Sequence, residues 1–372
     1  MRATLTTATS YSRPFDHFQR TRYFPALDGL RAISILLVIG LHSQDGLWMK
    51  LHGTIGVTVF FVISGWLITT LLLREETRAG RVHLGRFYLR RGFRLLPVYF
   101  AVLAIFVLLI VVLNLQWGHD AFIGSLPYYL TYQNDWAPTS LFGHTWSLAI
   151  EEKFYVVWPL LAFAVAAVRR VRIPMLIALL AFTLAAEQSQ AVPVYYLATY
   201  TPLVLGCLLA VLMHDRRTYR WIAALTHPAF TGTVVTAAVV QALLFEGIHG
   251  HVHTLFSFLT VLALPGVLVG AQPFGRVLSV RPLVYVGTRS YALYLVHPLV
   301  VTVVGYVIPA GSSNKLVEMA HLAAIVGISL AIAEVLYRLV EQPLIRAGRR
   351  LMAPRQVAPS IAPTESGRLV NA

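Results

Sequence analysis

Long apolar segments separated by short polar ones fill most of the chain. Most of these segments approach the roughly 20 residues that a helix needs to cross a bilayer. We therefore predict an all-α, polytopic bundle of about ten transmembrane helices. The expected spans are residues 26–46, 54–73, 95–115, 146–168, 173–186, 194–213, 221–245, 254–271, 284–308 and 316–339, of which the fifth is the shortest.

Composition agrees with this pattern and sets the domain boundaries. Of the 372 residues, 57% are hydrophobic and only 12% are charged, which excludes a soluble globule. Residues 1–22 lack the apolar core of a secretory signal, so we expect a cytoplasmic tail there. One membrane domain should follow at residues 23–345, and residues 346–372 should form a disordered cytoplasmic tail. The longest outward loop, residues 114–143, is too short for an independently stable domain.

The net charge of +14 reflects membrane topology. Of the 30 Lys and Arg residues, 26 lie in alternate polar segments, beginning with the N-terminus, and the opposite loops hold only Lys50 and Lys315. Cytoplasmic loops are rich in Lys and Arg, so this alternation places both termini in the cytoplasm. We therefore expect the lipid bilayer as a partner and no nucleic acid.

Cysteine and histidine usage gives little support for a metal or a resident cofactor. Cys207 is the single cysteine, which excludes an internal disulfide and argues against an iron–sulfur cluster or a Cys-ligated zinc site. His249, His251 and His253 alternate in an outer loop and could share one face of an extended segment. We assign no function to them and expect no metal and no bound cofactor.

Ionisable residues inside the predicted spans are the candidates for a site, because each costs about 2.5–3.5 kcal/mol on insertion scales. Arg31 and His42 lie eleven residues apart on the first span, which returns them to almost the same helix face. His42 could serve as a general base or accept an acyl group. The alternative is that Arg31 snorkels to the interface and His42 caps the helix.

The fourth span carries Glu151, Glu152 and Lys153. Ser147 and Glu151 are four residues apart and share a face, whereas Glu152 and Lys153 are rotated away by about 100° and 200°. We expect Glu151 to lie at the depth of His42 and to orient its imidazole. An ion pair between helices is the alternative.

Two further spans carry polar residues at a similar depth. Ser64 precedes Gly65, where the missing side chain permits close approach of another backbone. Tyr291, Tyr294 and His297 recur at three-residue spacing. We expect Ser64, Ser147, Tyr291 and His297 to contact substrate, against the alternative of packing and interhelical hydrogen bonds.

The loop between the second and third spans holds seven Arg within residues 74–94. Arg90, Arg91 and Arg94 fall near one side of a predicted helix. Arginine forks bind phosphates and diphosphates in a bidentate manner, so this face is our candidate nucleotide site. Anionic lipid head groups are the alternative ligand.

Several of these segments resemble motifs of an integral-membrane acyltransferase family, often called acyltransferase family three. The family includes bacterial polysaccharide and lipopolysaccharide O-acetyltransferases. The similarity covers about residues 25–345, with Trp66 at a position where Phe is commoner. The matching segments are "LDGLRAISILLVIGLH", "GVTVFFVISGWLIT", "FYLRRGFRLLP", "HTWSLAIEEKFYVVWP", "SYALYLVHPLV" and "VEQPL".

The resemblance implies a multi-pass protein of the bacterial inner membrane that uses acyl-CoA, most simply acetyl-CoA, to acylate a carbohydrate hydroxyl. Some members add a soluble hydrolase-like extension, which this sequence lacks, so a separate periplasmic relay protein is a further expected partner. The resemblance leaves two alternatives. One is a proton-coupled carrier or flippase for a lipid-linked sugar, and the other is an acyltransferase for a small secreted compound such as a macrolide.

Overall fold

The computed structural model describes residues 15–115, 117–165, 169–189, 191, 196–244, 254–269 and 273–352. All regular secondary structure in these ranges is helical, which confirms the predicted all-α class. The histidines at positions 249, 251 and 253 lie outside the described residues.

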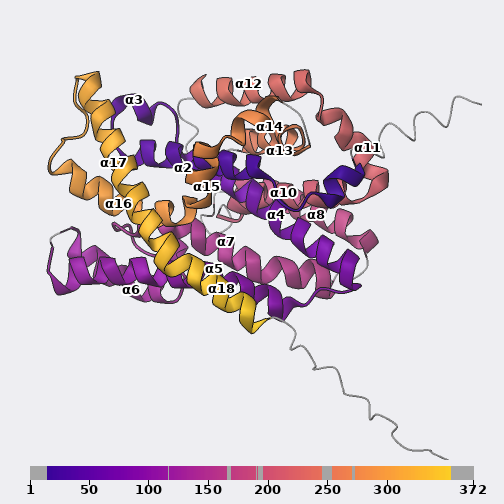
Figure 1. Ribbon diagram of the computed structural model, residues 1–372, viewed down its shortest axis with the longest axis horizontal. Helices are drawn as coiled ribbons and strands as arrows, with labels where there is room; N and C mark the ends of the chain where they lie inside the picture. The colour runs from indigo at the N-terminus through magenta and orange to yellow at the C-terminus, as the bar shows by residue number, and fades with distance from the viewer. Residues whose placement is uncertain are drawn as a thin grey trace, which may run out of the picture.

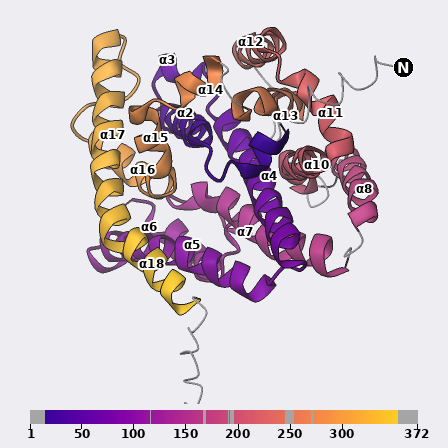
Figure 2. The same cartoon turned by 45° about the vertical axis from the view of Figure 1, so that its right-hand side comes forward.

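Helices α2 (Pro25–His42) and α4 (Thr54–Ala79) lie at the centre of the molecule in both views (Figures 1 and 2). The short helix α3 (Gly46–Met49) lies between them in sequence, and α10 (Thr201–His214) packs along α4. At Gly65 an added Cβ would come within 2.1 Å of the Leu203 carbonyl oxygen. The predicted close approach at Gly65 is therefore confirmed, because only a residue without a side chain fits there.

One part of the bundle comes from the middle of the chain. It contains α5 (Leu84–Val107), α6 (His119–Leu130), α7 (Trp146–Pro159) and α8 (Arg169–Glu187). Single π-helical turns extend α5 and α7, and three short 3₁₀ turns lie in the connections. The π turns are Leu108–Val112 and Leu160–Val165; the 3₁₀ turns are Asn134–Trp136, Gly143–Thr145 and Tyr196–Tyr200.

The remaining helices surround α2 and α4. In Figure 2, α17 lies at the left edge of the molecule, α8 and α11 lie at the right edge, and α12 lies at the top. The bounds are α11 (Arg216–Leu225), α12 (Pro228–Leu244), α13 (Thr254–Leu268), α14 (Pro273–Leu278), α15 (Arg281–Thr288), α16 (Ser290–Gly305), α17 (Lys315–Leu336), the π turn Tyr337–Glu341 and α18 (Gln342–Leu351).

Five helical segments of the described chain are long and apolar enough to cross a membrane, or six if a bent pair forms one span. The bent pair is α11 and α12, which meet at 69° within the expected span 221–245. Pro228 is the first residue of α12, a position where its missing N–H and fixed φ are tolerated. Proline does not fit inside a continuous helix, so α11 ends before it and the chain turns. The five segments are Pro25–His42, Thr54–Ala79, Leu84–Val112, Tyr196–His214 and Lys315–Leu351.

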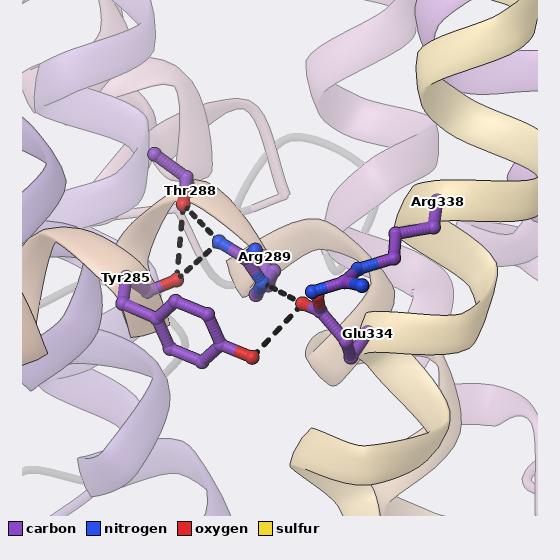
Figure 3. A network of polar contacts seen from close by, with 5 residues as sticks. All are labelled: Tyr285, Thr288, Arg289, Glu334 and Arg338. Atoms are coloured by element: carbon purple, nitrogen blue, oxygen red, sulfur yellow. Dashed lines mark hydrogen bonds and ion pairs between the residues drawn. The ribbon is translucent and has the colours of Figure 1, made fainter.

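The expected span 284–308 is also broken, at Arg289 between α15 and α16 (Figure 3). The Arg289 guanidinium bonds to Glu334 on α17 and donates to Thr288 Oγ1 at 2.9 Å. Tyr285 donates to the same Glu334 carboxylate at 2.9 Å, and Arg338 also binds it. This network attaches the break to α17 and so positions the first turn of α16.

Both predicted tails contribute to the folded protein near their boundaries. Residues 15–20 are helical, Phe18 is buried, and Arg74 donates to the Phe18 and Thr21 carbonyl oxygens at 3.0 and 2.8 Å. At the other end α18 continues to Leu351, so the boundary expected at residue 345 lies inside a helix.

Candidate active site

A chamber lies within the bundle. Its lining comes from α2, α4, α5, α7, α15, α16 and the π turn before α18, so it joins segments that are far apart in the sequence. Three cations and three carboxylates line it, namely Arg31, Arg91, Arg94, Glu151, Glu152 and Glu341. A chamber of this charge content inside an apolar bundle is expected to hold a polar ligand.

A wider basic cleft lies between α4, α5 and α18. It adjoins the chamber, because Arg91 and Arg94 line both cavities. Arg90 lines only the cleft and pairs with Glu75 at 2.9 Å. Arg90, Arg91 and Arg94 all lie on α5, which confirms the predicted helix. The arginines of the cleft are Arg22, Arg74, Arg78, Arg86, Arg90, Arg91, Arg94 and Arg349.

Glu151 lies in the chamber with two hydroxyl groups bound to one carboxylate oxygen. Both Ser64 of α4 and Tyr155 of α7 donate to Glu151 Oε1, and Tyr155 Oη lies 3.1 Å from Ser64 Oγ. The Arg91 guanidinium lies 4.7 Å from the centre of the Tyr155 ring. The sequence predicted Glu151 and Ser64 as site residues but gave no sign that they are partners. Tyr155 is one helical turn from Glu151, a spacing that could have identified it.

Arg31 reaches the chamber from the first turns of α2. Its Nη1 lies 3.3 Å from Asp28 Oδ1, and the Tyr23 hydroxyl donates to Asp28 Oδ2 at 2.7 Å. Desolvation and the Asp28 carboxylate raise the pKa of Tyr23 to about 12, so Tyr23 remains a neutral donor at physiological pH. Asp28 thereby holds Arg31 in place, a role that the sequence interpretation missed.

His42 does not pair with Glu151, contrary to the expectation from the sequence. Its Nδ1 lies 2.8 Å from the Val38 carbonyl oxygen, one turn back on α2. Its ring packs edge-on against His297 of α16, with ring centres 4.9 Å apart. The chamber lining includes Tyr294 and Ser147 but not His42. Spacing along α2 could not show which face of α7 or α16 the imidazole would meet.

The end wall of the chamber joins α7 to α16. Tyr294 donates to the His144 carbonyl oxygen at 2.6 Å, and its hydroxyl lies 2.7 Å from Ser147 Oγ. Tyr291 lines the chamber and donates to the Leu95 carbonyl oxygen at 3.0 Å. The residues predicted to contact substrate thus divide into two groups: Ser64, Ser147 and Tyr291 line the chamber, and His297 lies behind Tyr294.

The neighbouring charges on α7 have different environments. Lys153 donates to both carboxylate oxygens of Asp135 at 2.7 Å, whereas Glu152 faces the chamber. Sequence reasoning treated Glu152 only as a residue rotated away from Glu151. The rotation was correct, but the chamber surrounds enough of α7 to contact both carboxylates.

Glu341 is a further chamber residue that sequence reasoning missed. It ends the π-helical turn Tyr337–Glu341, is 4% exposed, and has one carboxylate oxygen without a hydrogen-bond partner among the described residues. The segment "VEQPL" contributed to the family resemblance without being assigned a role in the site. π-Helical turns are frequent at functional sites, which supports a role for this carboxylate.

The polar groups that line the chamber are carboxylates, hydroxyls and guanidinium groups. Among the described residues, no three His, Cys, Asp or Glu side chains are arranged to hold a metal ion. Cys207 is buried in α10 with its Sγ 3.6 Å from the Gly65 carbonyl oxygen. This thiol packs between α10 and α4 and does not line the chamber.

The chain is similar in sequence to bacterial proteins named as O-acetyltransferases. O-acetyltransferase OatA of Staphylococcus aureus is 30% identical over 370 residues, which cover 89% of the chain and 59% of the relative. Peptidoglycan O-acetyltransferase OatA of Listeria monocytogenes is 27% identical over 373 residues, which cover 91% of the chain and 57% of the relative. The chain therefore spans less than two thirds of the length of these relatives.

A search of solved structures finds no significant match. The family model described as "Acyltransferase domain" matches residues 24–338. This range begins just before α2 and ends in the π turn that precedes α18, so it contains nearly every residue of the chamber. The chain therefore belongs to the acyltransferase domain family.

Proposed function

We propose that this protein is a membrane O-acetyltransferase that moves an acetyl group from acetyl-CoA to a hydroxyl of a cell-surface carbohydrate. The observation that carries the proposal is that a basic cleft adjoins a polar chamber, with Arg91 and Arg94 lining both. The name of the Listeria relative supports peptidoglycan as the acceptor. The long apolar helices support a membrane location, which we propose is the bacterial plasma membrane.

The two cavities suit the two parts of acetyl-CoA. The cleft gathers eight arginines and only one carboxylate, Glu75, which favours a nucleotide with several phosphates. The narrower chamber is lined by aromatic rings and hydroxyls, such as those of Tyr132, Tyr155 and Tyr291, which suit an uncharged pantetheine arm. Acetyl-CoA is therefore proposed as a co-substrate that enters from the cytoplasmic side.

Two chemical routes agree with the position of His42. In one, His42 acts as a general base on the acceptor hydroxyl, a role that contributes about 10²–10⁴-fold in enzymes. In the other, His42 accepts the acetyl group before the acceptor does. In both, Arg31 and Glu151 act on the chamber side, Arg31 on the thioester oxygen and Glu151 through Ser64 and Tyr155.

A direct transfer assay tests the proposal. The purified protein, in lipid nanodiscs, is incubated with [¹⁴C]acetyl-CoA and peptidoglycan fragments, and label in the glycan is counted. We expect label to enter the glycan with the wild type and not with His42→Ala. No acetyl-CoA consumption by the folded wild type, with any of several glycans, would refute the proposal.

The principal alternative is a proton-coupled carrier for a lipid-linked sugar. The buried Glu341 carboxylate with an unpartnered oxygen favours it, because such groups can carry protons. A carrier would move its substrate across vesicle membranes without consuming acetyl-CoA. An acyltransferase for a small secreted compound would consume acetyl-CoA but leave the glycan unlabelled. If a separate periplasmic relay protein is needed, acetyl-CoA would be consumed without transfer to the glycan until that protein is added.

A further inference from the structure

The N-terminal segment, residues 15–24, is packed against the bundle. Phe18 is 1% exposed, and its ring centre lies 5.1 Å from that of His214 on α10 and 6.2 Å from that of Tyr219 on α11. Buried aromatic contacts of this kind contribute strongly to packing. The segment is therefore part of the folded bundle, whereas the sequence predicted a cytoplasmic tail up to residue 22.

The residues on both sides of Arg22 are held by hydrogen bonds. Arg74 of α4 donates to the Thr21 carbonyl oxygen at 2.8 Å, next to the end of the short helix, where free carbonyls attract a cation. The Tyr23 hydroxyl donates to Asp28 Oδ2 at 2.7 Å. The backbone at Arg22 is thereby fixed, and ordering a binding residue in advance lowers the entropy cost of binding.

The exposed Arg22 side chain lines the basic cleft. It is the cleft residue that the N-terminal segment contributes, since the other lining residues come from α4, α5, α18 and residues next to these helices. The segment thus closes one side of the cleft with a cation.

Most of the cleft arginines have no carboxylate partner. Arg74 is committed to backbone carbonyl oxygens, and Arg90 pairs with Glu75. Like charges that share a cleft repel one another, so the arginines left unpaired favour an anionic ligand. Those without an ion pair in the part of the chain that the structure describes are Arg22, Arg78, Arg86, Arg91, Arg94 and Arg349.

Arg22 lies away from the chamber. It lines only the cleft, whereas Arg91 and Arg94 line the cleft and the chamber. In CoA, a diphosphate joins the pantetheine arm to adenosine, and a third phosphate is attached to the ribose. With the arm in the chamber, the diphosphate lies beside Arg91 and Arg94, and the ribose phosphate lies farther out in the cleft.

We propose that the N-terminal segment completes the nucleotide site and that Arg22 binds the ribose phosphate of acetyl-CoA, an inference that rests on the proposed function. The guanidinium donates two N–H groups to phosphate oxygens, a geometry that an arginine fork matches. Arg22 acts in binding alone, since it lies outside the chamber in which the acetyl group is transferred.

The test compares CoA with dephospho-CoA, which lacks only the ribose phosphate. Dissociation constants are measured by calorimetry on the protein in phosphatidylcholine nanodiscs. The wild type should bind CoA more tightly than dephospho-CoA. Arg22→Gln should raise Kd for CoA about fivefold and leave Kd for dephospho-CoA unchanged.

Arg20→Gln is the matched control, because Arg20 is an exposed arginine of the same segment that lines neither cavity. It should leave both dissociation constants unchanged. A comparable loss of CoA affinity in Arg20→Gln would indicate a general effect of charge and overturn the assignment to Arg22.

The remaining outcomes separate this inference from the proposed function. If the wild type binds CoA and the folded Arg22→Gln protein binds it equally well, the inference is wrong and the proposed function stands. Equal losses for CoA and dephospho-CoA would also overturn it, because the contact would then be with another part of the nucleotide. Weaker binding of phosphatidylglycerol by Arg22→Gln, with both nucleotide constants unchanged, would identify a lipid head group as the ligand instead. If the folded wild type binds no CoA and consumes no acetyl-CoA, the proposed function fails and this inference fails with it.

Discussion

His321, which is buried, and His42, which is partly buried, lie at the same side of the bundle and have opposite surroundings. His321 of α17 lies 2.8 Å from Asp45 through Nδ1, and both side chains are at most 1% exposed. The other oxygen of Asp45 accepts the Gly311 N–H at 3.0 Å. His42, three residues before Asp45, has no carboxylate partner in the part of the chain that the structure describes, and it packs on His297.

This difference separates a structural imidazole from the imidazole that we propose to be catalytic. Asp45 joins the α2–α3 connection to α17 and to the preceding loop, so its pair with His321 fixes the position of these segments. A catalytic imidazole needs an accessible lone pair, which His42 retains. The sequence interpretation expected the Glu151 carboxylate beside the His42 imidazole. The carboxylate that contacts a buried histidine is that of Asp45, and its pair with His321 has a structural role.

The largest expected effect comes from removing the His42 imidazole. His42→Ala should lower kcat for acetyl transfer by about 10²–10⁴-fold, because a general base is lost. His214→Ala is the matched control, since His214 Nδ1 also lies 2.7 Å from the carbonyl oxygen one turn back in the last turn of its helix. Equal rates for the two variants in the labelled-glycan assay would contradict a catalytic role of His42.

Glu151→Gln should have the next largest effect. The neutral amide oxygen of Gln accepts from Ser64 and Tyr155 more weakly than the Glu151 carboxylate does, and hydrogen bonds to charged groups contribute about 1.5–3 kcal/mol. We expect kcat to fall roughly 10- to 100-fold without loss of protein. Lys153→Gln, on the same helix but paired with Asp135, should change kcat less than about twofold; a similar loss in both variants would argue for a general disturbance of α7.

Asp45→Asn should reduce stability and leave catalysis intact. The change weakens a buried pair and its link to Gly311, which should cost about 1–3 kcal/mol of unfolding free energy. The thermal midpoint in detergent should fall, whereas kcat of the folded fraction should remain. Asp120→Asn is the control, because Asp120 pairs with His119 on the exposed surface and should shift the midpoint little. Loss of kcat in stable Asp45→Asn protein would place His321 among the catalytic groups.

The smallest expected effect concerns the basic cleft. Arg91→Lys should raise KM for acetyl-CoA about fivefold at unchanged kcat, since the ammonium group cannot reproduce a bidentate contact worth roughly 1 kcal/mol. Arg90→Lys should change KM less than about twofold, because Arg90 is exposed and already paired with Glu75. Initial rates across acetyl-CoA concentrations measure both values. A larger increase in KM for Arg90→Lys than for Arg91→Lys would indicate that the nucleotide binds farther from the chamber.

Much of the helical order could be predicted because it depends on local sequence. The face of Arg90, Arg91 and Arg94 follows from the helical period of α5, and the close approach at Gly65 follows from its missing side chain. The breaks at Pro228 and Arg289 were missed, because both lie inside long apolar segments where hydropathy alone continues the helix. The count of about ten spans and the cytoplasmic position of both termini stay predictions.

The sequence by itself determined the helical class, the polar residues inside apolar helices and the basic face of α5, since each depends on spacing within one segment. Only the tertiary structure decided the partners: Glu151 with Ser64 and Tyr155, and His42 with His297. These contacts depend on how each helix is rotated and shifted against its neighbours. That arrangement is set by packing across the whole bundle, as at the Leu203 carbonyl against Gly65, and spacing along one helix carries no information about it.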